Sequence, residues 1–100
     1  MTITKANDEE KITLAINGWL DVETVPQFKA YIDELEKTKK LVLDFKDVEY
    51  ISSLGIREIV ALYKSQKSES GEFGIINIRP EIMEIFSITG LDKKIDMTAL

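Results

Sequence analysis

The stretch LVLDFKDVEYISSLGIREIV, residues 41–60, decides the fold, because a buried strand and a helix follow one another in it. Residues 41–45 form a nearly continuous apolar run, which is typical of a strand in a parallel sheet. Residues 46–51 are predicted to form the loop after this strand. Apolar side chains then recur at helical spacing up to about Lys67, and those predicted to face the core are Ile56, Ile59, Val60 and Tyr63.

The segment before this stretch predicts a hairpin and a first helix. Residues 1–6 and 11–16 alternate polar and apolar side chains on either side of NDEE, which is typical of two strands joined by a turn. Residues 25–37 carry apolar side chains at helical spacing. Thr24 and Gln27 predict a capping box at the start of this helix, and the lysines of TKK are expected in its last turn.

The segment after it predicts one more strand and helix. The turn SESGE precedes residues 73–78, a second buried strand, and Pro80 and Gly90 mark the start and end of a helix. Residues 91–100 are expected to hold a short strand and a helical stub. Alternating helices and strands require crossovers, so the predicted class is α/β: a mixed, mostly parallel sheet of four to five strands with about four helices, in one domain over residues 1–100.

Composition excludes several classes of partner and chemistry. The net charge of −5 provides no basic patch for a nucleic acid or an anionic membrane surface. No apolar run approaches the length of a membrane span, and MTITKANDEEK lacks the pattern of a signal peptide. The chain has no cysteine and no histidine, so it has no disulfide, and a nucleophilic serine would lack the usual base. We therefore expect a cytoplasmic protein that is not an enzyme and uses no cofactor or metal.

The helix that follows residue 51 has a polar face with one apolar side chain on it. Ser53 and Arg57 lie opposite the predicted core face, with Leu54, Glu58 and Ala61 beside them. Leu54 has two interpretations: a single exposed leucine, which is common, or with Ala61 the apolar centre of a docking surface. Arg57 either pairs with Glu58 or Glu49, or reaches back toward a group on Ser53.

The two serines at the start of this helix compete for one structural role. A serine before an apolar helical run is usually the N-cap, whose oxygen accepts a backbone N–H. If Ser52 is the cap, Ser53 lies in the first turn with its hydroxyl toward solvent, where the free N–H groups tolerate a phosphate. Gly55 either is a permissive residue in the first turn or lets another protein approach the Ser53 hydroxyl closely.

Taken together, these segments resemble the STAS domain of anti-sigma factor antagonists. The resemblance rests on LVLDF, KDVEYI and SSLGI in succession, on GWLD before the first helix and on FSITGLDKKIDM near the end, so it covers nearly the whole chain. It implies a partner-switching regulator. In that family the unphosphorylated antagonist binds an anti-sigma factor that is also a GHKL-type serine kinase, and a metal-dependent PP2C-type phosphatase reverses the phosphorylation.

The resemblance also implies the site. The phosphoacceptor is Ser53, two residues before the matching Gly55, with Ser52 as the alternative. Here Ser52 replaces a family aspartate, Leu54 a small residue and Arg57 a frequent second glycine. The residues expected at the partner surface are Asp21, Ser52, Ser53, Leu54, Gly55, Arg57, Glu58 and Ala61. Alternative functions are an accessory subunit of an ABC-type transporter, without phosphorylation, and a scaffold module of a signalling assembly.

Overall fold

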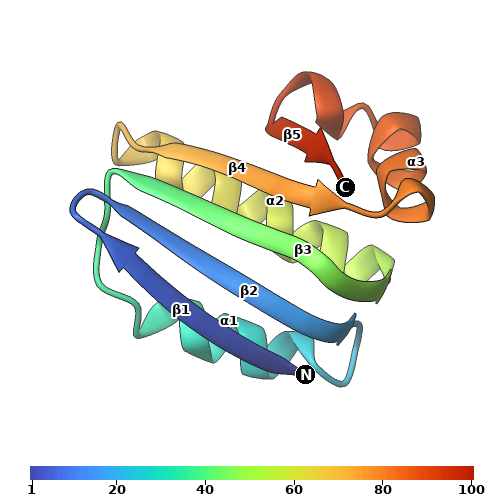
Figure 1. Ribbon diagram of the computed structural model, residues 1–100, viewed down its shortest axis with the longest axis horizontal. Helices are drawn as coiled ribbons and strands as arrows, with labels where there is room; N and C mark the ends of the chain where they lie inside the picture. The colour runs from blue at the N-terminus through green and yellow to red at the C-terminus, as the bar shows by residue number, and fades with distance from the viewer.

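The computed structural model describes residues 1–100 and contains one five-stranded sheet, in which the strands lie in the order β1-β2-β3-β4-β5 (Figure 1). β1 pairs with β2 in antiparallel fashion, and the other neighbours are parallel. The predicted α/β class with a mixed, mostly parallel sheet is therefore confirmed. The strands are β1 (Thr2–Asp8), β2 (Lys11–Leu20), β3 (Lys40–Ile51), β4 (Glu72–Ile78) and β5 (Asp96–Ala99).

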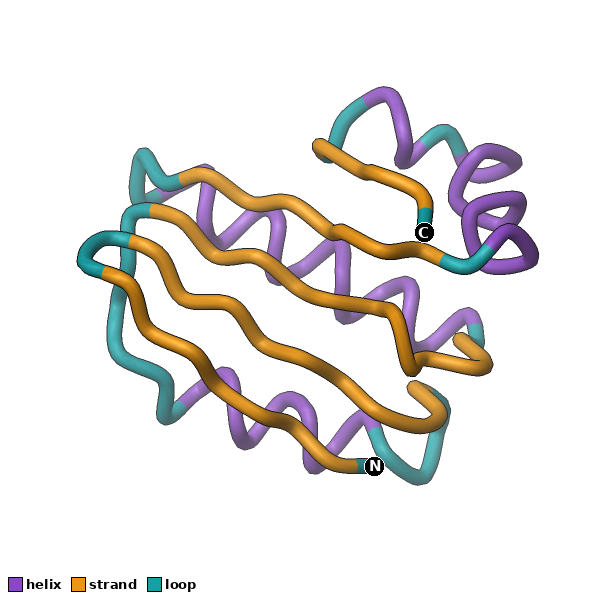
Figure 2. The backbone as a smooth tube through the Cα atoms, in the orientation of Figure 1, coloured by secondary structure: helices purple, strands orange, loops and turns teal.

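Three α-helices and a single 3₁₀ turn complete the chain, slightly fewer helices than expected. They are α1 (Val25–Asp33), α2 (Ser53–Ser68), α3 (Pro80–Thr89) and the 3₁₀ turn η1 (Leu91–Lys93). α1 and α2 cover the same face of the sheet, and α3 lies beyond the end of β4 (Figures 1 and 2). The tail holds the helical stub and short strand that the sequence predicts.

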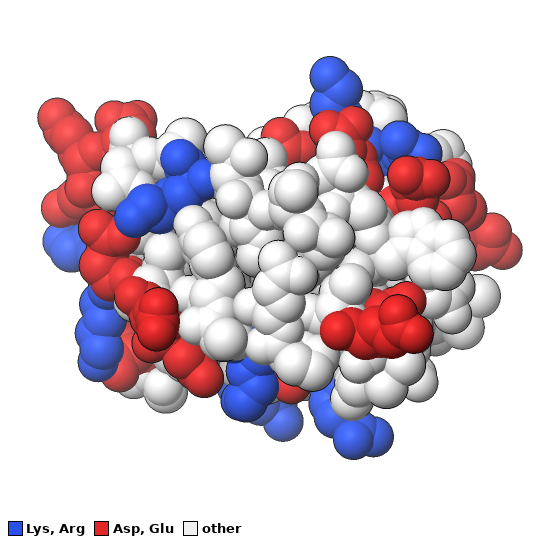
Figure 3. Space-filling model, turned by 90° about the horizontal axis from the view of Figure 1, so that it is seen from below, with Lys and Arg blue, Asp and Glu red and all other residues white.

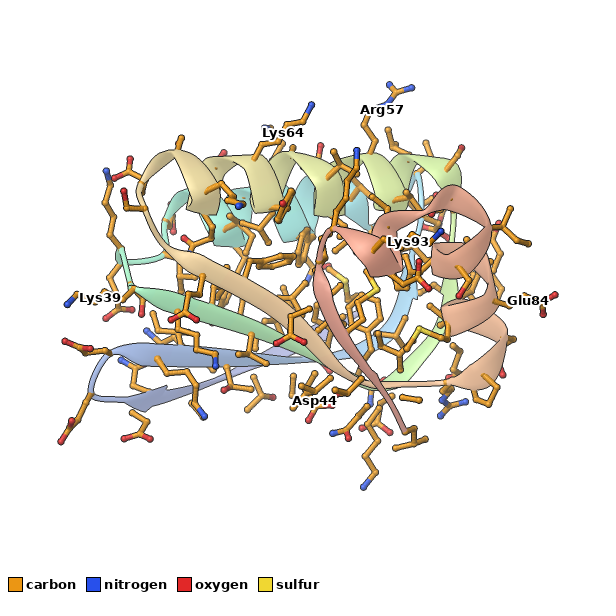
Figure 4. The ribbon with its side chains drawn as sticks, turned by 90° about the horizontal axis from the view of Figure 1, so that it is seen from above. Lys39, Asp44, Arg57, Lys64, Glu84 and Lys93 are labelled. Carbon is orange, nitrogen blue, oxygen red and sulfur yellow. The ribbon has the colours of Figure 1, made fainter.

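The core lies between the sheet and the helices. On β2 the side chains of Ile12, Leu14 and Ile16 alternate into the core, whereas β3 and β4 each contain three consecutive buried residues, 41–43 and 73–75. The opposite face has no helix over it and is mostly polar, although Val42 and Gly74 on its central strands are also buried (Figure 4). The largest fully buried side chains include Phe28, Phe45, Phe86, Leu14, Leu43, Ile59 and Ile75.

The predicted loop at residues 46–51 is wrong, because β3 continues through them. β2 also runs on past its alternating segment, with register shifts after Ala15 and after Gly18, and its last residues pair with this part of β3. Leu20 lies opposite Ile51, and both are buried, as is Val48. The chain stays extended here because β2 supplies hydrogen-bond partners that are distant in the sequence.

The first helix is shorter than predicted and begins differently. It ends at Asp33, so the lysines of TKK do not lie in its last turn. No side chain caps its start: the Thr24 hydroxyl donates to the Trp19 carbonyl at 2.6 Å, and Gln27 donates to the Met1 carbonyl at 3.1 Å. The capping box is therefore wrong, because both side chains donate to backbone carbonyls outside the helix.

After α1 the chain is tied back to the hairpin. The Thr38 hydroxyl and the Lys40 N–H both donate to the Glu10 carbonyl, at 2.7 and 3.1 Å. Lys5 on β1 pairs with Glu36 at 2.7 Å, and this hydrogen bond raises the pKa of Lys5 and lowers the pKa of Glu36. Residues 34–39 must connect the end of α1 to the start of β3, which lies beside β2. The helix therefore ends at Asp33.

α2 begins as predicted, but its buried face is rotated from the predicted one. Gly55, Ile59 and Leu62 are buried, whereas Val60 is only half-buried. Gly55 faces inward: a Cβ placed on it would lie 2.6 Å from the Leu20 carbonyl oxygen and 2.8 Å from Ile51 Cγ1. The glycine thus permits the helix to approach the end of β2, and the interpretation that it opens the surface beside Ser53 is wrong.

This close approach predicts the effect of adding one methyl group. We expect Gly55→Ala to lower the free energy of unfolding by about 1–3 kcal/mol, because backbone must move to accept the Cβ. At an exposed helical site the same change would raise stability, since alanine is the better helix former. Urea denaturation of the wild type and variant measures the difference, and a more stable Gly55→Ala protein would contradict the packing described here.

Candidate functional site

The start of α2 is held by a serine cap. Ser52 is extended, with φ −91° and ψ 174°, and its Oγ accepts from the Gly55 N–H at 3.3 Å. Its carbonyl accepts from the Ile56 N–H at 2.9 Å. The first bond satisfies a donor that a helix start leaves unpaired, and the second is the first regular bond of the helix. Together they confirm the prediction that Ser52 is the N-cap.

A second bond joins this cap to the sheet. The Ser52 N–H donates to the Leu20 carbonyl at 3.0 Å, and the same carbonyl oxygen lies close to Gly55. The first turn of α2 is therefore attached to the end of β2 as well as to β3, from which it emerges. This attachment gives the residues of the first turn a defined orientation.

Ser53 is the first residue of α2 and is exposed, as predicted, whereas Ser52 is half-buried. The face around Ser53 continues along the helix with Arg57 and Lys64, both exposed. Arg57 and Lys64 project from α2 away from the sheet (Figure 4). One helix thus presents a hydroxyl and two cations on the same side.

Arg57 has no carboxylate partner in the structure. The three ion pairs join Lys5 to Glu36, Lys37 to Glu69, and Lys39 to Glu10. The interpretation in which Arg57 pairs with Glu58 or Glu49 is therefore not realised here. Its guanidinium lies four residues after Ser53, within reach of a group on that side chain.

Leu54 is less exposed than its position in the sequence suggests. It is half-buried and packs against the core, so it is not an isolated leucine on a polar surface. Its predicted contact with a partner stays a prediction. A charged residue at this position is expected to weaken the fold as well as any docking, so Leu54→Asp does not separate the two effects.

Glu58 and Ala61 line a groove between α1 and α2. The groove has a volume of ≈ 200 Å³, and its other lining residues are Phe28, Lys29, Ile32, Asp33, Leu62 and Ser65. The predicted surface residues on α2 therefore divide into two sets: Ser53 and Arg57 point outward, and Glu58 and Ala61 turn toward α1.

Asp21 organises the turn between β2 and α1. Its Oδ1 accepts from the N–H groups of Glu23 and Thr24 at 3.0 and 3.2 Å, and its carbonyl accepts from Val25 at 2.8 Å. The preceding residue, Leu20, is the one that binds Ser52. Asp21 and the start of α2 therefore lie at the same end of the sheet, although they come from distant segments.

Sequence reasoning missed the aromatic pair at this end. Trp19 and Tyr50 lie opposite each other on β2 and β3, with ring centroids 5.5 Å apart and planes at 53°. Both are exposed, and so is Val22 in the following turn. The aromatic residue types were visible in the sequence, but their pairing was not, because residues 46–51 were predicted to be a loop.

Charged groups are unevenly distributed over the molecule. Seen from the side formed by β1 and α1, a broad area without charged side chains lies between charged borders (Figure 3).

No group of three or more acidic residues is arranged to hold a metal ion. None of the helices has both the length and the apolar character that crossing a membrane requires.

Comparisons with known proteins agree with this geometry. A family model described as "STAS domain" matches residues 2–99. The anti-sigma-B factor antagonist of Bacillus subtilis (strain 168) is 31% identical over 93 residues, covering 92% of this chain and 85% of that protein. A solved structure of an anti-sigma factor antagonist from Mycobacterium paratuberculosis is 25% identical with a TM-score of 0.88, covering 99% of this chain and 86% of that chain.

A more distant likeness shows the same fold. The Bacillus cell fate determinant SpoIIAA, solved in its phosphorylated form, is 18% identical with a TM-score of 0.77. The alignment covers 99% of this chain and 92% of that chain.

The cap geometry predicts what removal of the Ser52 hydroxyl does. We expect Ser52→Ala to reduce the free energy of unfolding by about 1 kcal/mol, because the Gly55 N–H loses its acceptor. Ser53→Ala serves as the matched control and is expected to change stability much less, since Ser53 is exposed. Chemical denaturation compares the two, and a larger loss for Ser53→Ala would show that the cap is assigned to the wrong serine.

Proposed function

Because this chain belongs to the STAS domain family, we propose that it is an anti-sigma factor antagonist whose partner exchange is controlled by phosphorylation of Ser53. Unphosphorylated, it binds an anti-sigma factor that is also a GHKL-type serine kinase. Phosphorylation releases it, and a PP2C-type phosphatase restores the first state. It acts in the cytoplasm as a regulator without catalysis of its own.

The position of Ser53 is the observation that supports this proposal most directly. Its hydroxyl is exposed in the first turn of a helix that is capped by Ser52 and attached to the end of β2. A phosphate added here would meet free N–H groups and the positive end of the helix dipole. The modification is therefore expected to leave the fold intact and to change only the surface.

The relatives support the same function. The name of the Bacillus subtilis relative states that it antagonises an anti-sigma-B factor. SpoIIAA, whose likeness to this chain concerns the fold alone, has been solved in unphosphorylated and phosphorylated forms. A phosphoryl group is thus compatible with this fold.

Electrostatics provides the physical basis of the switch. A phosphoserine adds about −1.5 to −2 charges at pH 7 to a molecule whose net charge is already −5. In the centre of an interface this charge must lose its water and is repelled by facing carboxylates. A loss of about 3 kcal/mol weakens binding more than a hundredfold, which suffices to exchange partners.

Substitution of Ser53 tests the proposal. Ser53→Ala is expected to stay folded, bind the kinase and accept no phosphate, whereas Ser53→Asp is expected to stay folded and bind weakly because its carboxylate imitates part of the phosphate charge. The assay is intact-mass analysis after incubation with a purified GHKL-type kinase from the same organism and ATP, followed by peptide mapping. Phosphate on Ser52 alone, or undiminished incorporation into Ser53→Ala, would disprove the assignment.

Arg57 is expected to influence the phosphate once it is present. Its unpaired guanidinium favours the dianion, so the second pKa of phosphoserine 53 should be lower in the wild type than in Arg57→Ala. Phosphorus NMR titration of the two phosphorylated proteins measures this difference. Lys64→Ala is the control, because it removes a cation from the same helix face at a greater distance from Ser53. Superimposable titration curves for the wild type and Arg57→Ala would rule the pairing out.

A further inference from the structure

Three apolar side chains are exposed together at the end of the sheet that carries Ser53. Trp19 is 55% exposed, Val22 69% and Tyr50 47%. Trp19 and Tyr50 contact each other across β2 and β3, and Val22 lies in the turn that follows β2. We call these three residues the aromatic patch. Exposed tryptophan and tyrosine are the side chains most enriched among residues that dominate protein interfaces.

The aromatic patch lies at the same end of the sheet as the start of α2. Tyr50 and Ser52 are separated by one buried residue, Ile51, and Trp19 directly precedes Leu20. The Leu20 carbonyl accepts the Ser52 N–H at 3.0 Å, which holds the end of β2 against the helix start. A partner that binds at this end of the sheet can therefore reach both Ser53 and the patch.

The patch is held in place before any partner binds. The Trp19 carbonyl accepts the Thr24 hydroxyl at 2.6 Å, and the Thr24 Oγ1 accepts the Asp21 N–H at 2.9 Å. These bonds fix the turn that carries Val22. Since the two rings already contact each other, burying them costs less side-chain ordering than burying flexible side chains would.

The charged side chains in the segments that carry the patch are mostly acidic. No lysine or arginine occurs between Ile12 and Phe28, where Asp21 and Glu23 are the charged residues. In residues 46–57 the acidic residues Asp47 and Glu49 lie between Lys46 and Arg57, the two cations of this segment. Glu23, Asp47 and Glu49 are exposed. The fitting partner surface therefore has an apolar depression for the rings and basic side chains around it.

We propose that the aromatic patch is a second part of the interface with the anti-sigma factor kinase, next to Ser53, and that it supplies much of the binding energy. The inference rests on the proposed function and extends it: Ser53 decides whether the complex persists, and the patch determines which protein can form it. The kinase surface that covers the patch is apolar at its centre and basic at its rim.

The chain contains a single tryptophan, which gives the patch its own spectroscopic signal. Protein labelled with 5-fluorotryptophan has one fluorine resonance, and this resonance reports on Trp19 even when the kinase contains tryptophans. The labelled Ser53→Ala protein, which remains unphosphorylated, is titrated with the purified GHKL-type kinase and ATP. We expect the resonance to shift and broaden, and to lose its sensitivity to solvent D₂O, as Trp19 becomes covered.

Three variants in the same background test the energetic contribution. Trp19→Ser is expected to weaken kinase binding by about thirtyfold or more, as for an interface residue of this type. Val22→Ser, in a turn and remote from the core, should weaken binding by a smaller factor without affecting the fold. Leu100→Ser is the matched control: Leu100 is 62% exposed but follows β5, at the opposite edge of the sheet from β1, and its replacement should leave binding unchanged. Circular dichroism and thermal unfolding verify that each variant is folded.

The outcomes separate this inference from the proposed function. One outcome overturns the inference alone. In it, the kinase phosphorylates the wild type on Ser53, but the fluorine resonance does not move, and Val22→Ser and Trp19→Ser bind as tightly as Leu100→Ser. The aromatic patch is then not part of the interface. If the kinase neither binds nor phosphorylates the wild type, the proposed function fails and this inference with it. If the resonance shifts with protein concentration alone and sedimentation shows a dimer, a second copy of the chain covers the patch, which also overturns the inference.

Discussion

The contact between the last residue of β2 and the first turn of α2 organises this molecule. One carbonyl oxygen, that of Leu20, accepts a hydrogen bond from Ser52 and lies where a side chain on Gly55 would be. A strand end and a helix start can approach so closely only when a glycine faces the carbonyl. The contact fixes the rotation of α2 about its axis, and therefore which of its residues face the core and which face solvent.

Each surface feature at this end of the sheet depends on that rotation. With Gly55, Ile59 and Leu62 turned inward, Ser53, Arg57 and Lys64 are directed outward, and Glu58 and Ala61 turn toward α1. The same contact brings the turn after β2 beside the helix. A hydroxyl, a free guanidinium and an exposed aromatic pair thus come from three segments that meet at the same end of the sheet.

The sequence predicted the features that depend on neighbouring residues. The hairpin around NDEE, the strand at residues 73–78, the cap at Ser52 and the glycine that ends α3 all follow from local preferences, and the structure confirms them. Family resemblance added the fold and the choice of Ser53 as the acceptor.

The errors share one cause, the pairing of distant segments. Residues 46–51 lack a strand-like pattern of their own and are extended because β2 lies beside them. Gly55 looked like a surface residue because its contact with Leu20 crosses from another segment. The contact between Trp19 and Tyr50 was not predicted, because it also depends on the pairing of β2 with β3. When the buried face of a helix is predicted from apolar residues alone, a glycine is ignored. In α2, however, the glycine makes the close contact with the Leu20 carbonyl.

The central position of β3 has a consequence for how the protein folds. The β1–β2 hairpin forms from local contacts, but its apolar face stays in water until β3 joins β2 in parallel, which requires the intervening helix to cross over. Such non-local pairing is slow and leaves few stable partial structures. Because Ser52 binds Leu20 only after that step, the geometry around Ser53 exists only in the completed fold. Under the proposed function, a kinase that depends on this geometry would therefore act on completely folded molecules and not on nascent or unfolded chains.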